Sequence, residues 1–328
     1  MTKTIEAVRE RESISILELF GGIGACTKAL KNIGMNVNVV DYVEIDKYAV
    51  KSYNAINGTN FEPQDITKWN KDIKVDLIMH GSPCQDISIA GLQAGADKDT
   101  GTRSSLMYET IRIVEKLNPK YVIWENVKNL LSKKHKHNFD NYIDKLEKLG
   151  YNSYYQVLNA KDYGVPQNRE RVYTVSIRKD IDNGNFKFPE KEPLKIILQD
   201  LLEKNVDEKY YLTENMINYL ENGKYQSAKV SNKLKTTETG ISPTLDTMQG
   251  GNRQPFVKTQ NKRIRKLVPL ECWKLMTFDN EDFYKAKETG NSNSQLYKQA
   301  RKLNCSKGFR KNIFKFIKGE LNGSQRKN

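Results

Sequence analysis

The stretch LELFGGIGA, residues 17–25, holds the strongest structural signal in the chain. It begins as an apolar strand, reaches glycines at positions 21, 22 and 24, and continues into a helical pattern over 24–33. Glycine lets the backbone approach a ligand closely, and the first N–H groups of a helix have no partner within it. The spacing differs from the G-x-G-x-x-G of dinucleotide-binding proteins, which disfavours NAD. The stretch predicts a strand–turn–helix unit that holds a nucleoside cofactor; a purely structural tight turn is the alternative.

Similar apolar runs recur along the first half of the chain. Each is rich in Val, Ile or aromatic residues and is bounded by Gly, Asp, Asn or Pro, as expected of buried strands. The predicted strands are 14–20, 37–45, 75–81, 121–127 and 171–177, and helical periodicity occurs at 24–33, 104–118 and 138–150. This alternation predicts an α/β fold with a Rossmann-like, mainly parallel sheet and helices on both faces. Ligands bind such sheets at the carboxyl ends of the strands.

The pattern changes after residue 180. Residues 183–257 mix polar residues and glycine with short apolar stretches, which indicates a small, loop-rich domain. Helical periodicity returns from residue 263 in RIRKLVPLECWKLM. We therefore expect residues 1–180 to form the first part of a large domain, 181–260 a small domain, and 261–328 a return to the large domain.

The composition excludes several classes of protein. Of the 328 residues, 38% are hydrophobic and 29% charged, and no apolar run is long enough to suggest a membrane span. Charges stand at the N-terminus where a signal peptide needs an apolar stretch, so a cytoplasmic protein is expected. The four cysteines form no C-x-x-C pair and only three histidines occur, which disfavours a metal site and a disulfide framework.

The formal net charge of +14 suggests a polyanionic partner such as a nucleic acid. Residues 301–328 alone hold nine Lys and Arg against one Glu. Much of the charge therefore comes from this tail. A lysine-rich solvated surface explains the charge about as well as a nucleic-acid footprint does.

Polar and reactive residues follow the predicted strands. Glu44 ends the second strand, where a carboxylate can hold both hydroxyls of a ribose. Cys84, in GSPCQDISIAG (81–91), follows the third strand. Pro83 restricts Ser82 to an extended conformation and stiffens the entry to the thiol. A cysteine taken alone is more often a buried structural residue than a nucleophile.

Two further motifs share this edge of the predicted sheet. WENV places Glu125 at the end of the fourth strand, where it can share a cleft with Cys84. In QNRERVY (167–173), Arg169 and Arg171 are two residues apart and so point to one face of an extended segment. Surface salt bridges are the alternative for the arginines. Together, the motifs would place a thiol, a carboxyl group and two guanidinium groups at the carboxyl ends of the strands.

In this order, FGGIG, Glu44, PCQ, ENV and QNRERVY resemble the cytosine-C5 DNA methyltransferase family over about residues 14–178 and 263–300. The resemblance implies methyl transfer from S-adenosylmethionine to C5 of a specific cytosine in double-stranded DNA. Cys84 would attack C6 of a cytosine flipped out of the duplex. Glu125 would hydrogen-bond N3 and Arg171 would hold O2. Arg169 would support the site and the phosphate backbone.

The resemblance also implies cofactor and DNA contacts. Ile45 stands where the family often has an aromatic residue, so adenine stacking should be weaker. Residues 85–105 resemble a loop that closes over flipped DNA, and 243–251 resembles a target-recognition segment, for which a plain surface hairpin is the alternative. The implied cofactor residues are Phe20, Gly22, Gly24, Glu44, Ile45, Asp65, Ile66, Pro83 and Leu106. The implied DNA-contacting residues are Gln85, Ser88, Arg103, Ser105, Thr244 and Arg253.

The C-terminus departs from the family. After YKQA (297–300) the family has Gly-Asn-Ser and a Val/Ile-rich helix, whereas this chain has RKLNCSKG (301–308). Those residues can be written AGG AAA CTC AAT TGT AGT AAA GGT. Read one base later, this gives Gly-Asn-Ser-Ile-Val-Val-Lys. We infer a single-base frame shift after Ala300, with natural divergence as the alternative, and expect weakened cofactor binding.

Three functions stay open at this point. The first is a DNA cytosine methyltransferase that acts as a monomer, with a cognate restriction endonuclease as an expected partner and no membrane. The second is a catalytically impaired DNA-binding remnant, because of the altered tail. The third is an RNA cytosine-C5 methyltransferase, disfavoured because its usual Cys-Phe-Thr segment is absent.

Overall fold

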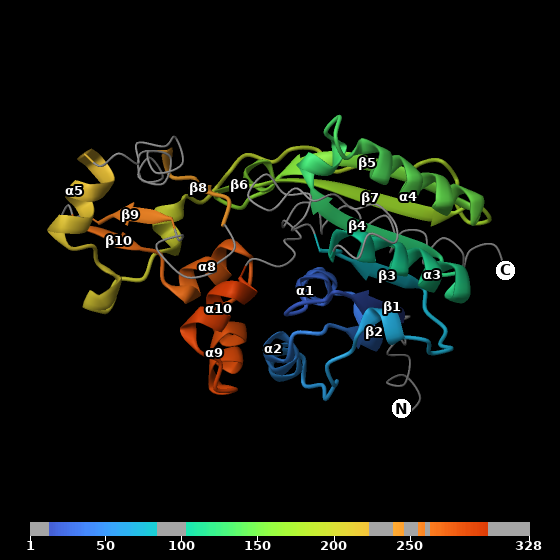
Figure 1. Ribbon diagram of the computed structural model, residues 1–328, viewed down its shortest axis with the longest axis horizontal. Helices are drawn as coiled ribbons and strands as arrows, with labels where there is room; N and C mark the ends of the chain where they lie inside the picture. Colours follow the sequence, from blue (N-terminus) through green and yellow to red (C-terminus); the bar gives the residue numbers. More distant parts are fainter. Residues whose placement is uncertain (1–12, 84–102, 223–238, 246–254, 260–262, 301–328) are drawn as a thin grey trace, which may run out of the picture.

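The computed structural model describes residues 13–83, 103–222, 239–245, 255–259 and 263–300. Its centre is a six-stranded sheet in the order β2-β1-β3-β4-β7-β5 (Figure 1). The first four of these pair in parallel, and β7 pairs antiparallel to both β4 and β5. The mainly parallel α/β sheet is thus confirmed. The strands are β1 (Ser13–Leu19), β2 (Asn36–Val43), β3 (Leu77–His80), β4 (Tyr121–Val127), β5 (Tyr151–Asn159) and β7 (Glu170–Arg178).

Helices cover both faces of this sheet. Successive strand residues point to opposite faces, so the sheet contributes to two cores. Ile16 and Met79 belong to one apolar cluster with residues of α1, whereas Leu17 and Ile78 belong to another with residues of α3 and α4. The helices are α1 (Ala25–Asn32), α2 (Lys47–Asn57), α3 (Met107–Leu117) and α4 (Lys136–Lys148). The expectation of helices on both faces is therefore confirmed.

The sequence prediction missed α2 and β5 in the first part of the large domain, and α9 (Asn280–Glu288) and α10 (Asn293–Gln299) in its second part. The helix α2 begins after Asp46, whose side chain accepts a hydrogen bond from the Tyr48 N–H, and ends at Gly58 in the left-handed region. Such caps satisfy backbone groups that the helix leaves unpaired. The strand β5 lies at the sheet edge, and half of its residues are polar. An edge strand buries little on its outer side, which weakens the alternation that marks a strand.

The second part of the chain forms short elements beyond the sheet. Figure 1 shows α5 (Glu214–Asn222), β9 (Phe256–Lys258) and β10 (Ile264–Lys266) at one end of the molecule, with α8 between them and the sheet. The antiparallel strands β9 and β10 lie on either side of residue 260, one of the two predicted domain limits. The limits at 180 and 260 stay predictions. The helical pattern expected from residue 263 was wrong for its first residues. The helix starts only at Pro269, a residue suited to the first helical turn.

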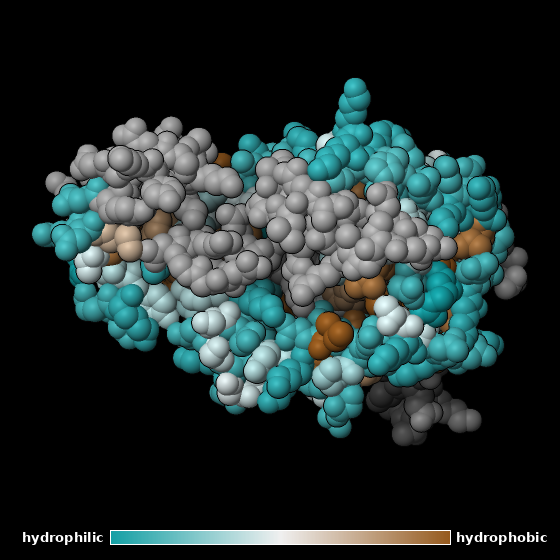
Figure 2. Space-filling view, viewed as in Figure 1, coloured by the Kyte–Doolittle hydropathy of each residue, from teal (hydrophilic) through white to brown (hydrophobic). Residues whose placement is uncertain are grey.

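The chain returns to the sheet through three short helices. These are α8 (Pro269–Leu275), α9 (Asn280–Glu288) and α10 (Asn293–Gln299). Trp273 and Leu296 are fully buried in the apolar cluster that contains α1. In the described ranges no helix has the length and hydropathy needed to cross a membrane. The face in Figure 2 is mainly hydrophilic, with apolar atoms near α1 and β2.

Candidate active site

The glycine turn after β1 has a backbone that few other residues could adopt. Phe20, Gly22 and Gly24 have φ angles of 52°, 57° and 84°. A Cβ added at Gly21 would lie 2.6 Å from the ring of Tyr42, and one at Gly24 would also meet a tyrosine ring. Side chains rarely tolerate such positive φ values, and Phe20 does so at some energetic cost. The turn therefore brings bare backbone to the carboxyl end of β1.

Glu44 lies directly after β2 and is buried. Its two carboxylate oxygens accept the N–H of Gly22 at 3.1 Å and the N–H of Asp46 at 2.9 Å. The carboxylate thus bridges the glycine turn and the start of α2. The next residue, Ile45, is 71% exposed although it is apolar. A fixed acceptor for ribose hydroxyls beside an exposed apolar side chain fits an adenosine group.

The segment predicted to contact adenine lies beside Glu44, because the Gln64 N–H donates to the Glu44 carbonyl at 2.9 Å. Asp65 caps a short 3-10 helix, η1 (Ile66–Lys68), and accepts from the backbone and hydroxyl of Thr67. Those hydrogen bonds lower the pKa of Asp65. Ile66 is buried, and Leu106 packs against the same apolar cluster as Ile66. The structure therefore gathers these residues on one side of the sheet.

The predicted acid and both arginines meet at the end of β4. Arg171 Nε lies 3.1 Å from Glu125 Oε1, and Arg169 Nη2 lies 3.9 Å from the same oxygen. Glu125 and Arg169 are buried, and the Arg171 side chain is largely buried. Because β7 runs antiparallel to β4, it places Arg171 opposite Val127, two residues beyond Glu125. Two strands from distant parts of the sequence thus build one charged cluster.

Ser82 is a site residue that the sequence analysis did not assign to the site. Its hydroxyl oxygen accepts the indole N–H of Trp124 at 3.1 Å and the side-chain amide of Asn126 at 3.2 Å. Both donors flank Glu125 on β4. Alternate residues of a strand share one face, so two polar donors at positions 124 and 126 could have indicated a shared hydrogen-bond acceptor on that face of β4. The chain leading to Cys84 is therefore tied to the strand that carries Glu125.

A buried histidine supports this connection. His80, the last residue of β3, stacks on Trp124 with ring centroids 5.6 Å apart, and its Nε2 lies 2.8 Å from the Tyr142 hydroxyl. Burial lowers the pKa of His80 to about 3, so the ring is neutral. Pro83, half-buried, continues from Ser82. Cys84 lies outside the described residues.

The predicted DNA contacts are described only in part. Gln85, Ser88 and Arg253 lie outside the described residues, and Arg103 and Ser105 belong to a short helix, η2 (Arg103–Leu106), that precedes α3. Thr244 follows β8 (Ser242–Pro243), which pairs with β6 (Gln167–Asn168) directly before Arg169. The Thr244 hydroxyl donates to the Asn168 carbonyl at 2.7 Å. Its one proton is thus engaged, and donation to a phosphate would require that bond to open.

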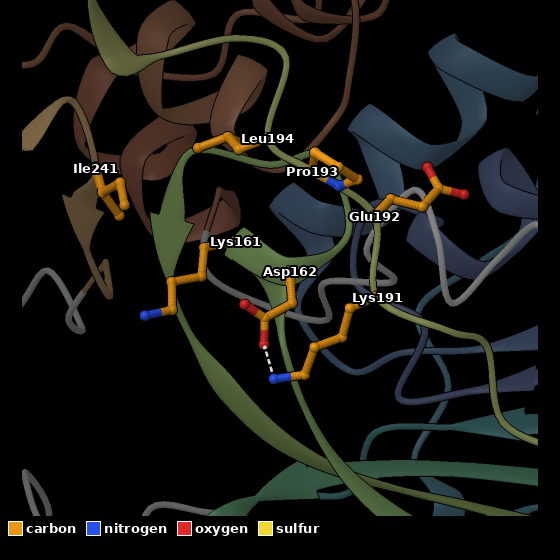
Figure 3. Close-up of a pocket in the computed structure, with 7 residues that line it drawn as sticks. All are labelled: Lys161, Asp162, Lys191, Glu192, Pro193, Leu194 and Ile241. Atoms are coloured by element: carbon orange, nitrogen blue, oxygen red, sulfur yellow. Dashed lines mark ion pairs between the residues drawn. The ribbon is translucent and has the colours of Figure 1, made fainter.

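An open pocket of about 420 Å³ is lined by residues other than the predicted DNA-contacting ones. Figure 3 shows it between the short helix η4 (Ala160–Asp162) and the segment 191–194, with the Lys191–Asp162 ion pair of 3.0 Å on its wall. It contains none of the predicted cofactor or catalytic residues. Among the described residues, no group of three or more His, Cys, Asp or Glu could hold a metal ion.

An α/β sheet with a buried carboxylate directly after β2 and a Glu–Arg cluster at the end of β4 is the arrangement of an enzyme that uses a nucleoside cofactor. The family model of the C-5 cytosine-specific DNA methylases matches residues 14–301, and the chain belongs to that family. It is therefore a DNA cytosine methyltransferase. The family and the fold imply S-adenosylmethionine as methyl donor and DNA as substrate. The match ends at residue 301, one residue after Ala300.

Individual relatives agree with this assignment. The type II methyltransferase M2.ScrFI of Lactococcus lactis subsp. cremoris is 42% identical over 230 residues, which cover 69% of this chain and 62% of the relative. The orphan methyltransferase M.SPBetaI of Bacillus phage SPbeta is 31% identical and covers 88% of this chain and 94% of its own. The structure of the Entamoeba histolytica methyltransferase EhMeth shares the fold, with a TM-score of 0.73, 17% identity and coverage of 94% and 99%.

Proposed function

We propose that this chain methylates C5 of a specific cytosine in double-stranded DNA through a covalent bond between Cys84 and C6. The observation that carries the proposal is the largely buried Glu125–Arg171 pair, 3.1 Å apart, whose Glu125 lies on β4, the strand to which Ser82 is anchored. Both groups have the chemistry to hold the polar edge of a cytosine. Cytosine C6 is inaccessible in a stacked duplex, so the base must leave it.

The chain's residues would act as follows. The Cys84 thiolate forms a bond to C6, which pushes electron density onto the ring and makes C5 nucleophilic. Glu125, in its protonated form, would donate a hydrogen bond to N3, and Arg171 would donate to O2, so the negative charge that develops on the ring is stabilised. Arg169 supports Glu125 from the other side. After transfer, loss of the C5 proton to a base and of the Cys84 thiolate from C6 restores the aromatic ring.

The cofactor would lie across the glycine turn and Glu44. S-adenosylmethionine supplies an electrophilic methyl group and leaves as a neutral thioether. Glu44, fixed by two backbone N–H groups, would accept the ribose hydroxyls, and Ile45 would cover one adenine face. The other proposed contacts to the cofactor come from Phe20, Gly22, Gly24, Asp65, Ile66, Pro83 and Leu106.

DNA would be held by residues on either side of the flipped base. Gln85 and Ser88 would fill the space left in the duplex, and Arg103 and Ser105 would contact phosphates. Thr244 and Arg253 belong to the proposed recognition segment. A restriction endonuclease that cuts the same site is the partner such an enzyme would protect against.

The test is methylation by the purified full chain. Unmethylated DNA is incubated with S-adenosylmethionine, and 5-methylcytosine is located by bisulfite sequencing. The same DNA carrying 5-fluorocytosine should trap a covalent adduct, because fluorine at C5 cannot leave as a proton. Cys84→Ser should abolish both signals, and Cys305→Ser in the tail is the matched control. Methylation that survives Cys84→Ser would refute the proposed mechanism.

A further inference from the structure

The end of the described chain docks on α2 through a closed set of polar contacts. The side-chain amide of Asn291 donates to the Tyr48 carbonyl at 3.1 Å and to the Ser52 hydroxyl oxygen at 2.8 Å. Gln299 donates to the same carbonyl at 2.9 Å and accepts the Ser52 hydroxyl proton at 3.0 Å. Asn291, Gln299 and Ser52 are all buried. Breaking one buried hydrogen bond leaves its partner unsatisfied, so this docking is specific.

The N-cap residue of α2, Asp46, also holds the Glu44 carboxylate. The N–H of Asp46 donates to Glu44 Oε1, and the Asp46 side chain caps α2 by accepting from the Tyr48 N–H. Lys298 of α10 reaches the other Asp46 oxygen at 2.9 Å. The C-terminal segment therefore contacts the two residues, Asp46 and Tyr48, that determine where the first turn of α2 lies.

A second connection links the same C-terminal region to the glycine turn. Lys28 of α1 lies 2.7 Å from both Asp279 and Asp282 at the start of α9. The helix α1 directly follows Gly24, as α2 follows Glu44 and Asp46. The returning segment thus fastens both helices that lead away from the cofactor site, at positions about 250 residues away in the sequence.

We infer that Asn291, Lys298 and Gln299 are positioning residues that orient the Glu44 carboxylate toward the cofactor ribose through α2. This inference rests on the ribose role proposed for Glu44. The geometry carries it, because Glu44 is held by one N–H from the glycine turn and one from Asp46. Movement of α2 displaces the second donor and lets the carboxylate rotate away from a ribose.

The first test needs no ligand. Amide hydrogen exchange is measured across residues 44–52 in the full chain and in Gln299→Glu, which keeps the side-chain shape but loses the amide donor. We expect exchange at Asp46 and Tyr48 to be about tenfold faster in the variant, because protection reports how often local hydrogen bonds open. Lys285→Met is the matched control, since Lys285 pairs with the exposed Glu281 one turn earlier on α9. Unchanged exchange in a folded Gln299→Glu would overturn the inference.

The second test asks whether the effect reaches the ribose. The probes are S-adenosylhomocysteine and its 2′-deoxyribose analogue, and calorimetry gives both dissociation constants. The ratio used here is the dissociation constant of the analogue divided by that of S-adenosylhomocysteine. Gln299→Glu should weaken binding of S-adenosylhomocysteine about tenfold and leave the analogue nearly unchanged, so the ratio falls. Lys298→Met, at a half-exposed side chain, should lower the ratio about twofold.

The outcomes separate this inference from the proposed function. If Glu44→Gln keeps the wild-type ratio, the ribose role of Glu44 is wrong, and so is the inference. If Glu44→Gln removes the preference for ribose but Gln299→Glu and Lys298→Met keep it, only the inference fails. If Gln299→Glu does not fold, Lys298→Met and Ser52→Ala decide the matter by the same exchange and ratio measurements.

Discussion

Arg171 Nε and Glu125 Oε1 lie 3.1 Å apart across two antiparallel strands, and both side chains are largely shielded from water. The pair brings together a carboxylate from residue 125 and a guanidinium from residue 171 at the carboxyl end of β4. A charge pair at low dielectric interacts more strongly than one at the surface. Both side chains have the polar groups needed for the role proposed for them, which is to hold the polar edge of a base.

Glu125→Gln should lower the methyl-transfer rate at least about hundredfold, because the amide can hydrogen-bond N3 but cannot transfer a proton to it. Binding of S-adenosylhomocysteine should be unchanged, since Glu44 and the glycine turn are untouched. Single-turnover methylation of a short duplex measures the rate. Glu170→Gln is the control, because Glu170 is an exposed neighbour that pairs with Lys128. A rate within about twofold of the wild type would contradict the role of Glu125.

Ser82→Ala should slow formation of the covalent adduct with 5-fluorocytosine DNA, because the segment leading to Cys84 loses its attachment to β4. The oxygen removed accepts from both Trp124 and Asn126, so stability should fall by about 1–3 kcal/mol. Urea unfolding measures that loss.

A double-mutant cycle of Ser82→Ala with Trp124→Phe shows how much of the stability loss comes from the hydrogen bond between these two side chains. We expect a coupling of about 1 kcal/mol between positions 82 and 124, because the two side chains share one hydrogen bond. Additive losses of stability, together with normal adduct formation in Ser82→Ala, would show that Ser82 does not position the thiol segment.

Glu18 should make stability depend on pH beneath the glycine turn. Burial raises the pKa of Glu18 to about 7, and the hydrogen bond from Thr27 opposes the rise only partly. Between pH 4.5 and 7 the unfolded chain has lost this proton while the folded chain retains it. Stability should therefore fall as the pH rises through that range, by about 1.4 kcal/mol per unit at most.

Glu18→Gln has no titrating group at this position, so comparing it with the wild type isolates the contribution of Glu18. The difference in unfolding free energy between variant and wild type should grow in favour of the variant from pH 4.5 to 7 and then level off. Because the comparison cancels His80, whose lowered pKa acts in the opposite direction, no other correction is needed. A difference that is constant with pH would show that Glu18 is not buried as a neutral acid.

Restoring the reading frame should strengthen cofactor binding. A chain in which Gly-Asn-Ser-Ile-Val-Val-Lys replaces residues 301–307 should bind S-adenosylhomocysteine at least about tenfold more tightly, since it regains a segment that closes the family's cofactor pocket. Calorimetry on both chains measures the change. Equal affinities would mean that the present tail is functional, and a gene sequence without the required codons would exclude a frame shift.

Several features of this protein follow from the sequence by itself. Hydrophobic runs and glycine spacing predicted the α/β class, the strand–turn–helix unit at Gly21–Gly24 and the carboxylate after β2, because periodicity and backbone conformation are local properties. The order of PCQ, ENV and QNRERVY predicted the enzyme family, which the match over residues 14–301 confirms. The roles of single residues, including Cys84, stay predictions.

Only the tertiary structure determined how distant segments meet. Local patterns did not reveal the edge strand β5, the antiparallel course of β7 that sets Arg171 against Glu125, or the attachment of Ser82 to Trp124. Nor did they reveal that Gln299 fastens Ser52. Each of these contacts joins residues more than 40 positions apart or depends on strand neighbours. They arise from the packing of the whole chain, which no short window of sequence encodes.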